Sequence, residues 1–145
     1  RAGAKHIEVA ILDWGMNTLD LYVVKGNEVA ETYIGGAEVG MKNLLEEMNT
    51  DGRDLSELDA MLRDEEIKPT KEQIEAWVGA CLAEIKKTMP DLRRFGLVIP
   101  VGGSVVVADQ ELTAALMSKR ANVYRVKDPI TDNVSGLYKF AARNS

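Results

Sequence analysis

The sequence predicts an α/β domain in which helices cover a five-stranded mixed sheet. Strand-like runs rich in β-branched residues come first in the chain and indicate an antiparallel meander. Helical and strand-like segments then alternate, which is typical of crossover connections between parallel strands. The chain has 145 residues, of which 46% are apolar and 28% charged, so one domain with a buried core is expected.

Three strands are expected first, over His6–Leu12, Leu19–Lys25 and Glu28–Ile34. Each run alternates in part and is rich in β-branched side chains, as in a half-buried sheet. Gly26-Asn27 is a two-residue hairpin signal between the second and third strands. Asp13–Thr18 joins the first two strands by a longer turn.

Two helices are expected next. Gly35-Gly36 is predicted to end the third strand, and an apolar stripe over Val39–Met48 predicts the first helix. A shorter helix over Leu55–Leu62 follows, with an N-cap pattern formed by Asp54 and Glu57.

The sequence predicts its longest helix between Thr70 and Pro90. Thr70 and Gln73 have the spacing of a capping box, in which each side chain bonds the other residue's backbone N–H. Pro90 ends the helix because it cannot continue the hydrogen-bond pattern. One apolar face, expected in the core, recurs at steps of three and four residues: Ile74, Trp77, Val78, Cys81, Leu82 and Ile85.

The last part of the chain alternates strand and helix. Leu97–Val101 is an apolar run suited to a buried strand, and Pro100 predicts an end or an irregularity there. A helix over Asp109–Lys119, a fifth strand over Asn122–Val126 and a last helix over 133–141 are expected after it.

This order of elements is that of the ribonuclease-H-like fold. We expect residues 6–48 and 91–142 to form its body and residues 49–90 to form an inserted helical subdomain. Residues 1–5 are interpreted as a linker or a remnant of a longer chain.

The composition excludes several classes of function. Eighteen basic and 23 acidic residues give a net charge of −5, which argues against charge-driven binding of nucleic acid. No apolar run approaches the ~20 residues that cross a bilayer, and no secretory signal pattern is present. Cys81 is the single cysteine and His6 the single histidine. We therefore expect a cytoplasmic protein without disulfides and without a histidine-rich metal site.

The turn between the first two strands is the first candidate site. Its backbone amides and the Thr18 hydroxyl could hold a phosphate while Asp13 holds a Mg²⁺-bound water. An ordinary hairpin turn, in which Asp13 and Asn17 bond local backbone, has the same pattern. Trp14 in this turn is either a core side chain or an exposed contact for a partner.

Two further glycine pairs follow strands. Gly102-Gly103 and Ser104 come after the LVIPV run, and Gly35-Gly36 precedes the first helix. Glycines let a ligand approach the backbone closely, and a helix N-terminus supplies amides to phosphates. Each pair taken singly is also an ordinary turn. Together the three segments are expected at the carboxyl edge of the sheet, where open α/β sheets bind ligands.

With these segments the sequence resembles the second half of an actin-like ATPase, in the superfamily of actin, Hsp70 and sugar kinases. It is most similar to plasmid-segregation actins of the ParM/StbA type. Residues 13–20, DWGMNTLD, resemble the second phosphate motif, D-x-G-x-x-T-x-D. Residues 35–38 resemble the Gly-Gly-acid step after the meander, and residues 97–104, LVIPVGGS, resemble the adenosine motif. Residues 129–142 resemble the closing segment of ParM-like proteins.

The resemblance implies a site for ATP or GTP with Mg²⁺. Asp13 would position the Mg²⁺ through its water shell, and Gly15, Asn17 and Thr18 would face the β- and γ-phosphates. Gly36 would approach the sugar–phosphate region. The residues flanking the adenosine would be Gly102, Gly103 and Ser104.

The resemblance also implies partners. The first phosphate motif belongs to the N-terminal half of such ATPases, and nothing in this sequence matches it. ATP hydrolysis would need that missing half, and this half alone would be inactive. The intact protein would form a homo-oligomeric filament, with a DNA-bound adaptor protein for plasmid segregation. Met16 departs from the family pattern, which usually has a small residue there.

Other functions fit the same fold. The parent could be a non-polymerising ATPase related to Hsp70 or the sugar kinases, or the chain could be a stand-alone protein-interaction module without nucleotide. A ribonuclease-H-like nuclease could use Asp13 and Asp20 as metal-binding acids, but the acidic charge disfavours it.

Overall fold

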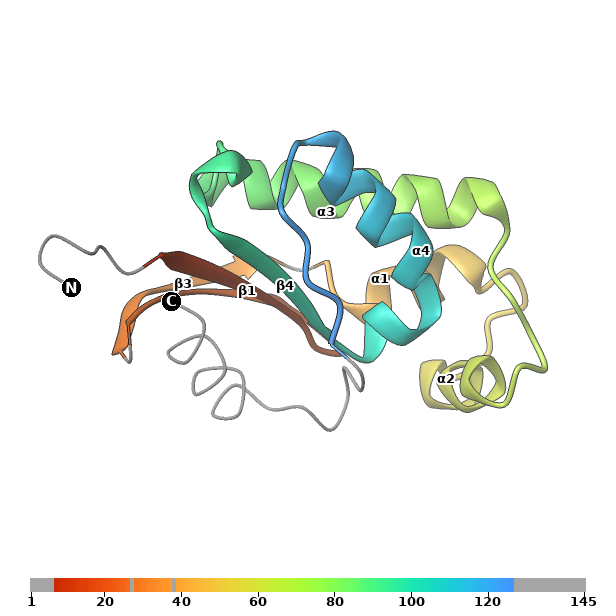
Figure 1. Cartoon of the computed structure of the whole chain (residues 1–145). Coiled ribbons are helices and arrows are strands. Elements are labelled where there is room, and N and C mark those ends of the chain that lie inside the picture. Colours follow the sequence, from red (N-terminus) through yellow and green to blue (C-terminus); the bar gives the residue numbers. More distant parts are fainter. Residues whose placement is uncertain (1–6, 27, 38, 127–145) are drawn as a thin grey trace, which may run out of the picture.

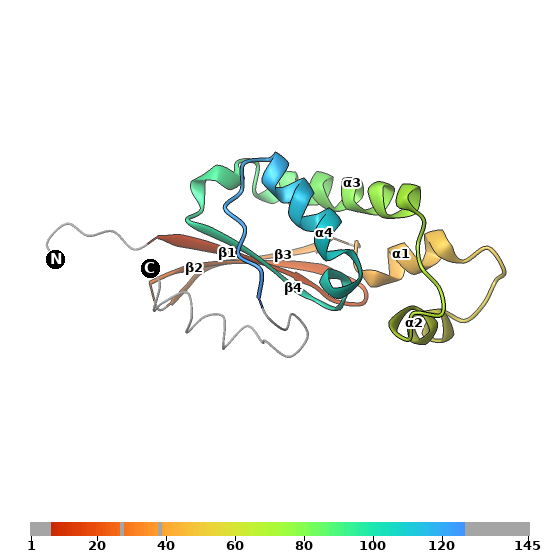
Figure 2. The same ribbon diagram turned by 45° about the vertical axis from the view of Figure 1, so that its right-hand side comes forward.

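The computed structural model describes residues 7–26, 28–37 and 39–126, with the backbone alone over 28–37. One four-stranded sheet lies against a layer of helices (Figures 1 and 2), which confirms the α/β class. The strands are β1 (Glu8–Trp14), β2 (Leu19–Lys25), β3 (Glu28–Ala37) and β4 (Leu97–Gly102). The helices are α1 (Met41–Met48), α2 (Leu55–Arg63), α3 (Lys71–Thr88), the 3₁₀ helix η1 (Leu92–Arg94) and α4 (Gly103–Ser118).

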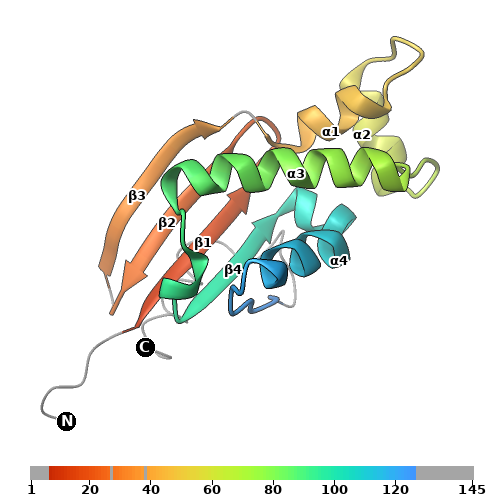
Figure 3. The same ribbon diagram turned by 90° about the horizontal axis from the view of Figure 1, so that it is seen from above.

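The strand order is β3-β2-β1-β4. The first three strands pair antiparallel as a meander, and β4 pairs parallel with β1. The antiparallel meander and a mixed sheet were predicted from the order of elements. The carboxyl ends of β1, β3 and β4 consequently lie at the same edge of the sheet (Figure 3).

β3 continues through Gly35-Gly36, so the prediction that it ends at these glycines was wrong. Leu19 pairs with Ala37, whereas Leu21 pairs with Tyr33. The chain from Tyr33 to Ala37 is therefore longer than the stretch of β2 that it faces. Glycines inside a strand commonly mark such a bulge, because glycine adopts irregular backbone conformations more easily than residues that carry a Cβ.

The sheet has four strands in the described ranges, not the five expected. Val123 forms one isolated parallel bridge: Val98 N–H donates to Asn122 O, and Tyr124 N–H donates to Val98 O, both at 2.9 Å. Backbone groups alternate along a strand, so Pro100 turns its nitrogen to the same side as Val98. This nitrogen carries no hydrogen to donate. Pairing therefore stops after one bridge.

The α4 helix begins at Gly103, earlier than the expected start at Asp109. Its backbone is non-helical at Ala108 (φ −125°, ψ 31°), so two helical pieces meet there at a kink. The first piece contains Val105–Val107, whose β-branched side chains lower helix propensity. Sequence reasoning missed this piece for that reason.

The two faces of the sheet bury different side chains because neighbouring residues of a strand point to opposite faces. One face packs with α1, α3 and α4 into the main core. Its sheet residues are Ala10, Leu12, Trp14, Leu19, Leu21, Val23 and Val98. The opposite face carries Val9, Ile11, Val24, Ile99 and Val101.

The long helix α3 lies across the sheet (Figure 3) and contributes Trp77, Cys81 and Ile85 to the main core. Figure 1 shows α2 beyond the edge of the sheet, beside the N-terminal end of α3. The inserted subdomain over residues 49–90 stays a proposal. Because α3 packs into the core beside the sheet, it belongs with the body of the domain. A separate subdomain would then comprise only the region around α2.

Several expected features lie outside the described residues: the last helix over 133–141, the closing segment 129–142 and the linker over 1–5. Among the helices that are described, none is long and apolar enough to span a bilayer.

The capping box at the start of α3 provides the first test. The Thr70 hydroxyl accepts from Gln73 N–H at 3.1 Å, and Gln73 Oε1 accepts from Thr70 N–H at 2.8 Å. Thr70→Ala removes one of these acceptors, so we expect it to lower the free energy of unfolding by about 1 kcal/mol. Urea denaturation measures this, with Thr70→Ser as the matched control that retains the hydroxyl. Equal losses for both variants would contradict the capping role.

Candidate functional site

The carboxyl edge of the sheet brings the residues of the predicted site together. Trp14, the last residue of β1, pairs with Gly102, the last residue of β4. The turn after β1 therefore lies beside the start of α4. Gly36 lies near the end of β3, two strands away from β1. The predicted residues at this edge are Asp13, Gly15, Asn17, Thr18, Gly36, Gly102, Gly103 and Ser104; nucleotide binding by them remains a prediction.

The turn after β1 caps the N-terminus of α1. Gly15 N–H donates to Thr18 O at 2.9 Å and closes the turn. Met41 N–H then donates to Gly15 O at 3.1 Å, and Lys42 N–H donates to Met16 O at 2.8 Å. These two helical amides would otherwise lack a partner. The N–H groups of Met41 and Lys42 are therefore not free to bind a phosphate, contrary to the expectation for this helix N-terminus.

The same contact turns other amides of the turn outward. In a planar trans peptide, the N–H points opposite to the C=O that precedes it. Because the carbonyls of Gly15 and Met16 face α1, the N–H groups of Met16 and Asn17 point away from it. No described residue accepts a hydrogen bond from either group, and Met16 is 42% exposed. Two adjacent outward N–H groups are a typical anion-binding arrangement.

Gly40, which sequence reasoning missed, permits this contact. A Cβ on Gly40 would lie 2.6 Å from both Gly15 O and Met16 O, closer than non-bonded atoms approach. The Trp77 indole Nε1–H donates to Gly40 O at 3.2 Å and fixes the same segment from α3. The only sequence signal was a glycine before a helix, which is common and nonspecific.

A second buried chain of hydrogen bonds ties the turn to α3. The Trp14 indole Nε1–H donates to Cys81 Sγ at 3.3 Å, and the thiol lies 3.8 Å from Val39 O. Burial raises the pKa of the Cys81 thiol to about 12, so the thiol keeps its proton and donates it to Val39 O. Trp14 is fully buried, with its ring centroid 6.4 Å from that of Trp77. It is a core side chain and not an exposed contact.

Asp13 and Asp20 stand opposite each other on β1 and β2. Burial, and then the neighbouring Asp20 charge, raise the pKa of the Asp13 carboxyl. Burial and the same two acids raise the pKa of the Tyr22 hydroxyl. A cation at this pair would relieve the repulsion. Within the described ranges, no three or more Asp, Glu, His or Cys side chains form a metal-binding group.

Gly102 connects β4 to α4 in a conformation that suits glycine. Its φ is +104°, and an added Cβ would lie 2.1 Å from Trp14 O. This glycine is explained by the close approach of two backbones, without any ligand.

The N-terminus of α4 lies beside a cation that the sequence did not signal. Arg63 Nη2, from the end of α2, would be 3.3 Å from a Cβ on Gly103. Arg63 Nε also donates to Asp59 Oδ2 at 2.9 Å. Ser104, in the first turn of α4, is fully buried, and its hydroxyl has no partner among the described residues. An arginine beside helix amides makes this corner attractive to an anion.

Comparisons with known proteins identify the fold. No protein-family model and no curated protein matches the sequence. Among solved structures, an archaeal actin homologue, Ta0583, matches with a TM-score of 0.65 and 14% identity over 97% of this chain and 50% of that one. A ParM filament from Clostridium botulinum matches with a TM-score of 0.66 and 16% identity over 96% and 46%. A PilM–PilN type IV pilus biogenesis complex matches with a TM-score of 0.62 and 16% identity over 95% and 44%.

The chain thus has the fold found in part of actin homologues and of ParM, as the sequence motifs predicted. It spans about half the length of each of these structures.

Gly40 provides a test of the contact between the turn and α1. Gly40→Ala places a methyl group against two backbone carbonyls, so we expect it to lower the free energy of unfolding by about 2 kcal/mol or more. The matched control is Gly79→Ala in α3, where an added Cβ meets nothing within 4 Å. It should raise the free energy of unfolding by about 1 kcal/mol. A neutral Gly40→Ala would contradict the close packing of the turn.

Asp13 provides a test of the carboxylate pair. Its pKa is raised in the folded chain, so folding is disfavoured as pH rises from the ordinary carboxyl pKa through the raised one. We expect Asp13→Asn to be more stable than the parent at pH 7, with the difference disappearing by about pH 3. Urea denaturation across this pH range measures it. Asp20→Asn should act in the same direction because it removes the repelling charge. A destabilised Asp13→Asn at pH 7 would show that hydrogen bonds favour the ionised carboxylate instead.

Proposed function

We propose that the chain is the nucleotide-binding half of an actin-like ATPase that assembles into filaments. The observation that carries this proposal is that three groups lie at one edge of the sheet. These are the outward N–H groups of Met16 and Asn17, the Asp13 carboxylate, and the N-terminus of α4 beside Arg63. Donors, a carboxylate and a guanidinium suit a phosphate-containing ligand with a cation.

Each group has a proposed task. The N–H groups of Met16 and Asn17 and the Thr18 hydroxyl would bind the β- and γ-phosphates. Mg²⁺ would offset the phosphate charge, and Asp13 would hold it through water. This role explains why a carboxylate can stand beside phosphates.

The base and sugar would lie further along the same edge. Gly36 would face the sugar–phosphate region, and Gly102 and Gly103 would flank the adenosine. Arg63, which pairs with Asp59, adds a guanidinium to this side. The Ser104 hydroxyl beside it is fully buried and has no described partner.

The similar structures support the proposal. One is a complex of the actin homologue Ta0583 with ADP, and another is a ParM filament. Because this chain covers about half of each, we propose that a missing N-terminal half completes the site. Phosphoryl transfer requires positioning from several sides, so hydrolysis is proposed for the two-half protein and not for this half. ATP or GTP, a cytoplasmic location, plasmid segregation and a DNA-bound adaptor belong to the same proposal.

A second candidate is a protein-interaction module that has the fold and binds no nucleotide. The PilM–PilN complex among the similar structures favours it, because that structure is a complex between two different proteins. A non-polymerising ATPase half would bind nucleotide but would not form filaments. These alternatives differ in nucleotide binding and in sedimentation.

Titration with ATP or GTP and Mg²⁺ tests the proposal on the protein that contains both halves. We expect Thr18→Val, Asp13→Asn and Arg63→Gln each to weaken nucleotide affinity about tenfold, through loss of one polar or charged contact. The matched control is Arg53→Gln, an exposed arginine paired with Asp51 before α2. Asp13→Asn should also abolish the dependence of affinity on Mg²⁺.

The outcomes separate the candidates. No nucleotide binding by the parent would remove the ATPase proposal and favour the interaction module. Nucleotide binding that is insensitive to the three substitutions would show that the site lies elsewhere. Binding without nucleotide-dependent pelleting would favour the non-polymerising ATPase.

A further inference from the structure

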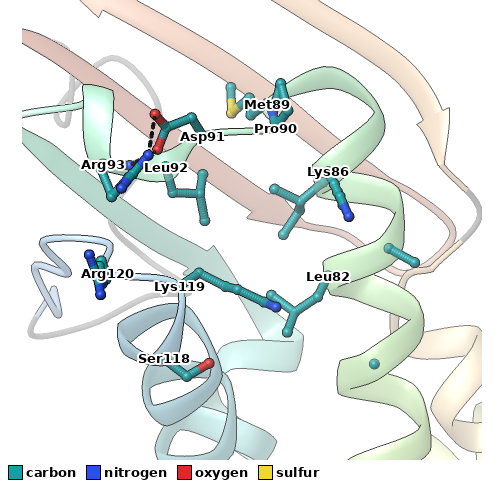
Figure 4. Close-up of a pocket in the computed structure, with 13 residues that line it drawn as sticks. Leu82, Lys86, Met89, Pro90, Asp91, Leu92, Arg93, Ser118, Lys119 and Arg120 are labelled. Atoms are coloured by element: carbon teal, nitrogen blue, oxygen red, sulfur yellow. Dashed lines mark hydrogen bonds and ion pairs between the residues drawn. The ribbon is translucent and has the colours of Figure 1, made fainter.

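The surface between α3 and α4 carries a groove of about 640 Å³ (Figure 4). It runs from Gly79, in the middle of α3, to η1 and the C-terminal end of α4. The helix α4 begins beside the candidate nucleotide site and reaches the groove with its last residue, Ser118, roughly 20 Å further along. A cavity of this size is in the range that holds a small molecule.

The floor of the groove is aliphatic. Ile85, Met89 and Leu92 are buried there, and Leu82 is half-buried beside them. None of the described residues that line the groove is aromatic. Flexible aliphatic and thioether side chains suit an alkyl chain, whereas stacking of a flat ring would need an aromatic partner.

The rim of the groove is positively charged. Lys86, Lys119 and Arg120 are exposed at it and form no ion pair within the described part of the chain. A further cation, Arg93, is neutralised by Asp91: Arg93 Nε donates to Asp91 Oδ1 at 2.8 Å, and this contact lowers the pKa of the Asp91 carboxyl. The C-termini of α3 and α4 contribute about half a negative charge each. A positive charge of about two therefore remains at the rim, on a chain whose net charge is −5.

Arg120 occupies a backbone position where glycine would be more stable. Its φ is 61°. The helix α4 ends there in a Schellman motif, in which Ala121 N–H donates to Leu116 O at 3.2 Å and Arg120 N–H donates to Met117 O at 2.9 Å. Glycine is usual at the left-handed residue of this motif. Since Lys119 already supplies a cation to the helix end, the fold does not account for the arginine.

Gly79 presents the reverse case. It lies inside α3, where alanine would be more stable. An added Cβ would meet nothing within 4 Å, so no contact with the described chain requires a glycine. A side chain at this position would instead narrow the groove that Gly79 lines. At both Gly79 and Arg120 the chain departs from the locally more stable residue, which is typical of functional sites.

We propose that the groove binds a free aliphatic carboxylate, with its alkyl chain on the aliphatic floor and its carboxylate at Lys119 and Arg120. Figure 4 shows Lys119 reaching from the end of α4 toward Leu82 on α3, so a cation stands close to the apolar lining. The planar guanidinium of Arg120 can donate to both carboxylate oxygens. The missing side chain at Gly79 leaves room for the alkyl chain. Binding at this site requires neither nucleotide nor assembly.

Isothermal titration calorimetry of the 145-residue chain with octanoate tests the proposal. We expect one saturable site and a raised thermal midpoint, because a ligand that binds the folded chain stabilises it. Hexanoate should bind more weakly and decanoate more tightly, by about twofold for each methylene, since a half-exposed methylene leaves water only in part. No saturable site at millimolar octanoate overturns the proposal. Uptake of many molecules with a lowered midpoint, as a detergent gives, also overturns it.

Two ligands of the same chain length test the rim. Octanol and octyltrimethylammonium keep the alkyl chain and lack the negative charge. We expect octanoate to bind about fivefold more tightly than octanol, and the cationic ligand to bind most weakly. Equal affinities for all three would contradict the role of the rim cations. Sedimentation of the chain with phosphatidylglycerol vesicles, without a saturable octanoate site, would assign these cations to a membrane surface and overturn the proposal.

Two variants separate ligand binding from a structural role. Arg120→Gly should weaken octanoate binding about fivefold and leave octanol binding unchanged, while it raises the thermal midpoint because glycine adopts positive φ without strain. Gly79→Leu should weaken both ligands about tenfold by filling the groove, while leucine favours the helix.

Each variant has a matched control outside the groove. Lys68→Gln removes an exposed cation elsewhere, and Ala80→Leu places the same side chain on the next residue of α3, which does not line the groove. Both controls should bind octanoate like the parent. Variants that bind as well as their controls overturn the proposal. The test uses no nucleotide, so its outcome is separate from that of the proposed function.

Discussion

The contact between the carbonyls of Gly15 and Met16 and the first amides of α1 determines the architecture of the candidate site. It satisfies the N-terminus of α1 with backbone from a distant strand turn, at 3.1 and 2.8 Å. It requires a residue without a side chain at position 40, because a Cβ would lie 2.6 Å from both carbonyls. The indoles of Trp14 and Trp77 and the Cys81 thiol then fix the turn and residues 39–40 to α3. The outward direction of the turn amides follows from this packing.

Two groups near the proposed ligand site are left poorly compensated by the fold. Asp13 opposes Asp20 across the hairpin with a raised pKa, and the buried Ser104 hydroxyl has no described partner. Arg63, which already pairs with the Asp59 carboxylate at 2.9 Å, stands beside helix amides that favour anions. The acid pair lowers stability in the absence of a ligand, and a cation bound together with an anion would compensate it. This pattern is why the site is interpreted as functional, although Gly102 alone is explained by packing.

Local signals predicted the parts of the fold that depend on local interactions. The capping box of Thr70 and Gln73, the apolar face of α3 and the meander all follow from residues near each other in the sequence. The errors occur where contacts with residues distant in sequence determine the local structure. Gly35-Gly36 is a bulge because β2 continues beside it, and the segment after α4 makes one bridge because Pro100 lies opposite. In the site, Gly40 and Arg63 were missed because their partners are remote in sequence and no motif marks them.

The site is one-sided, which bears on how it would be completed. Its described donors come from one sheet edge, the start of α4 and Arg63 at the end of α2, so a nucleotide bound there would be open to solvent on its other side. Phosphoryl transfer needs groups on that side as well, which is the physical reason to expect a second half. The helix α3 fixes the turn from the core side through Trp77, so a second half would meet the site from its outward side.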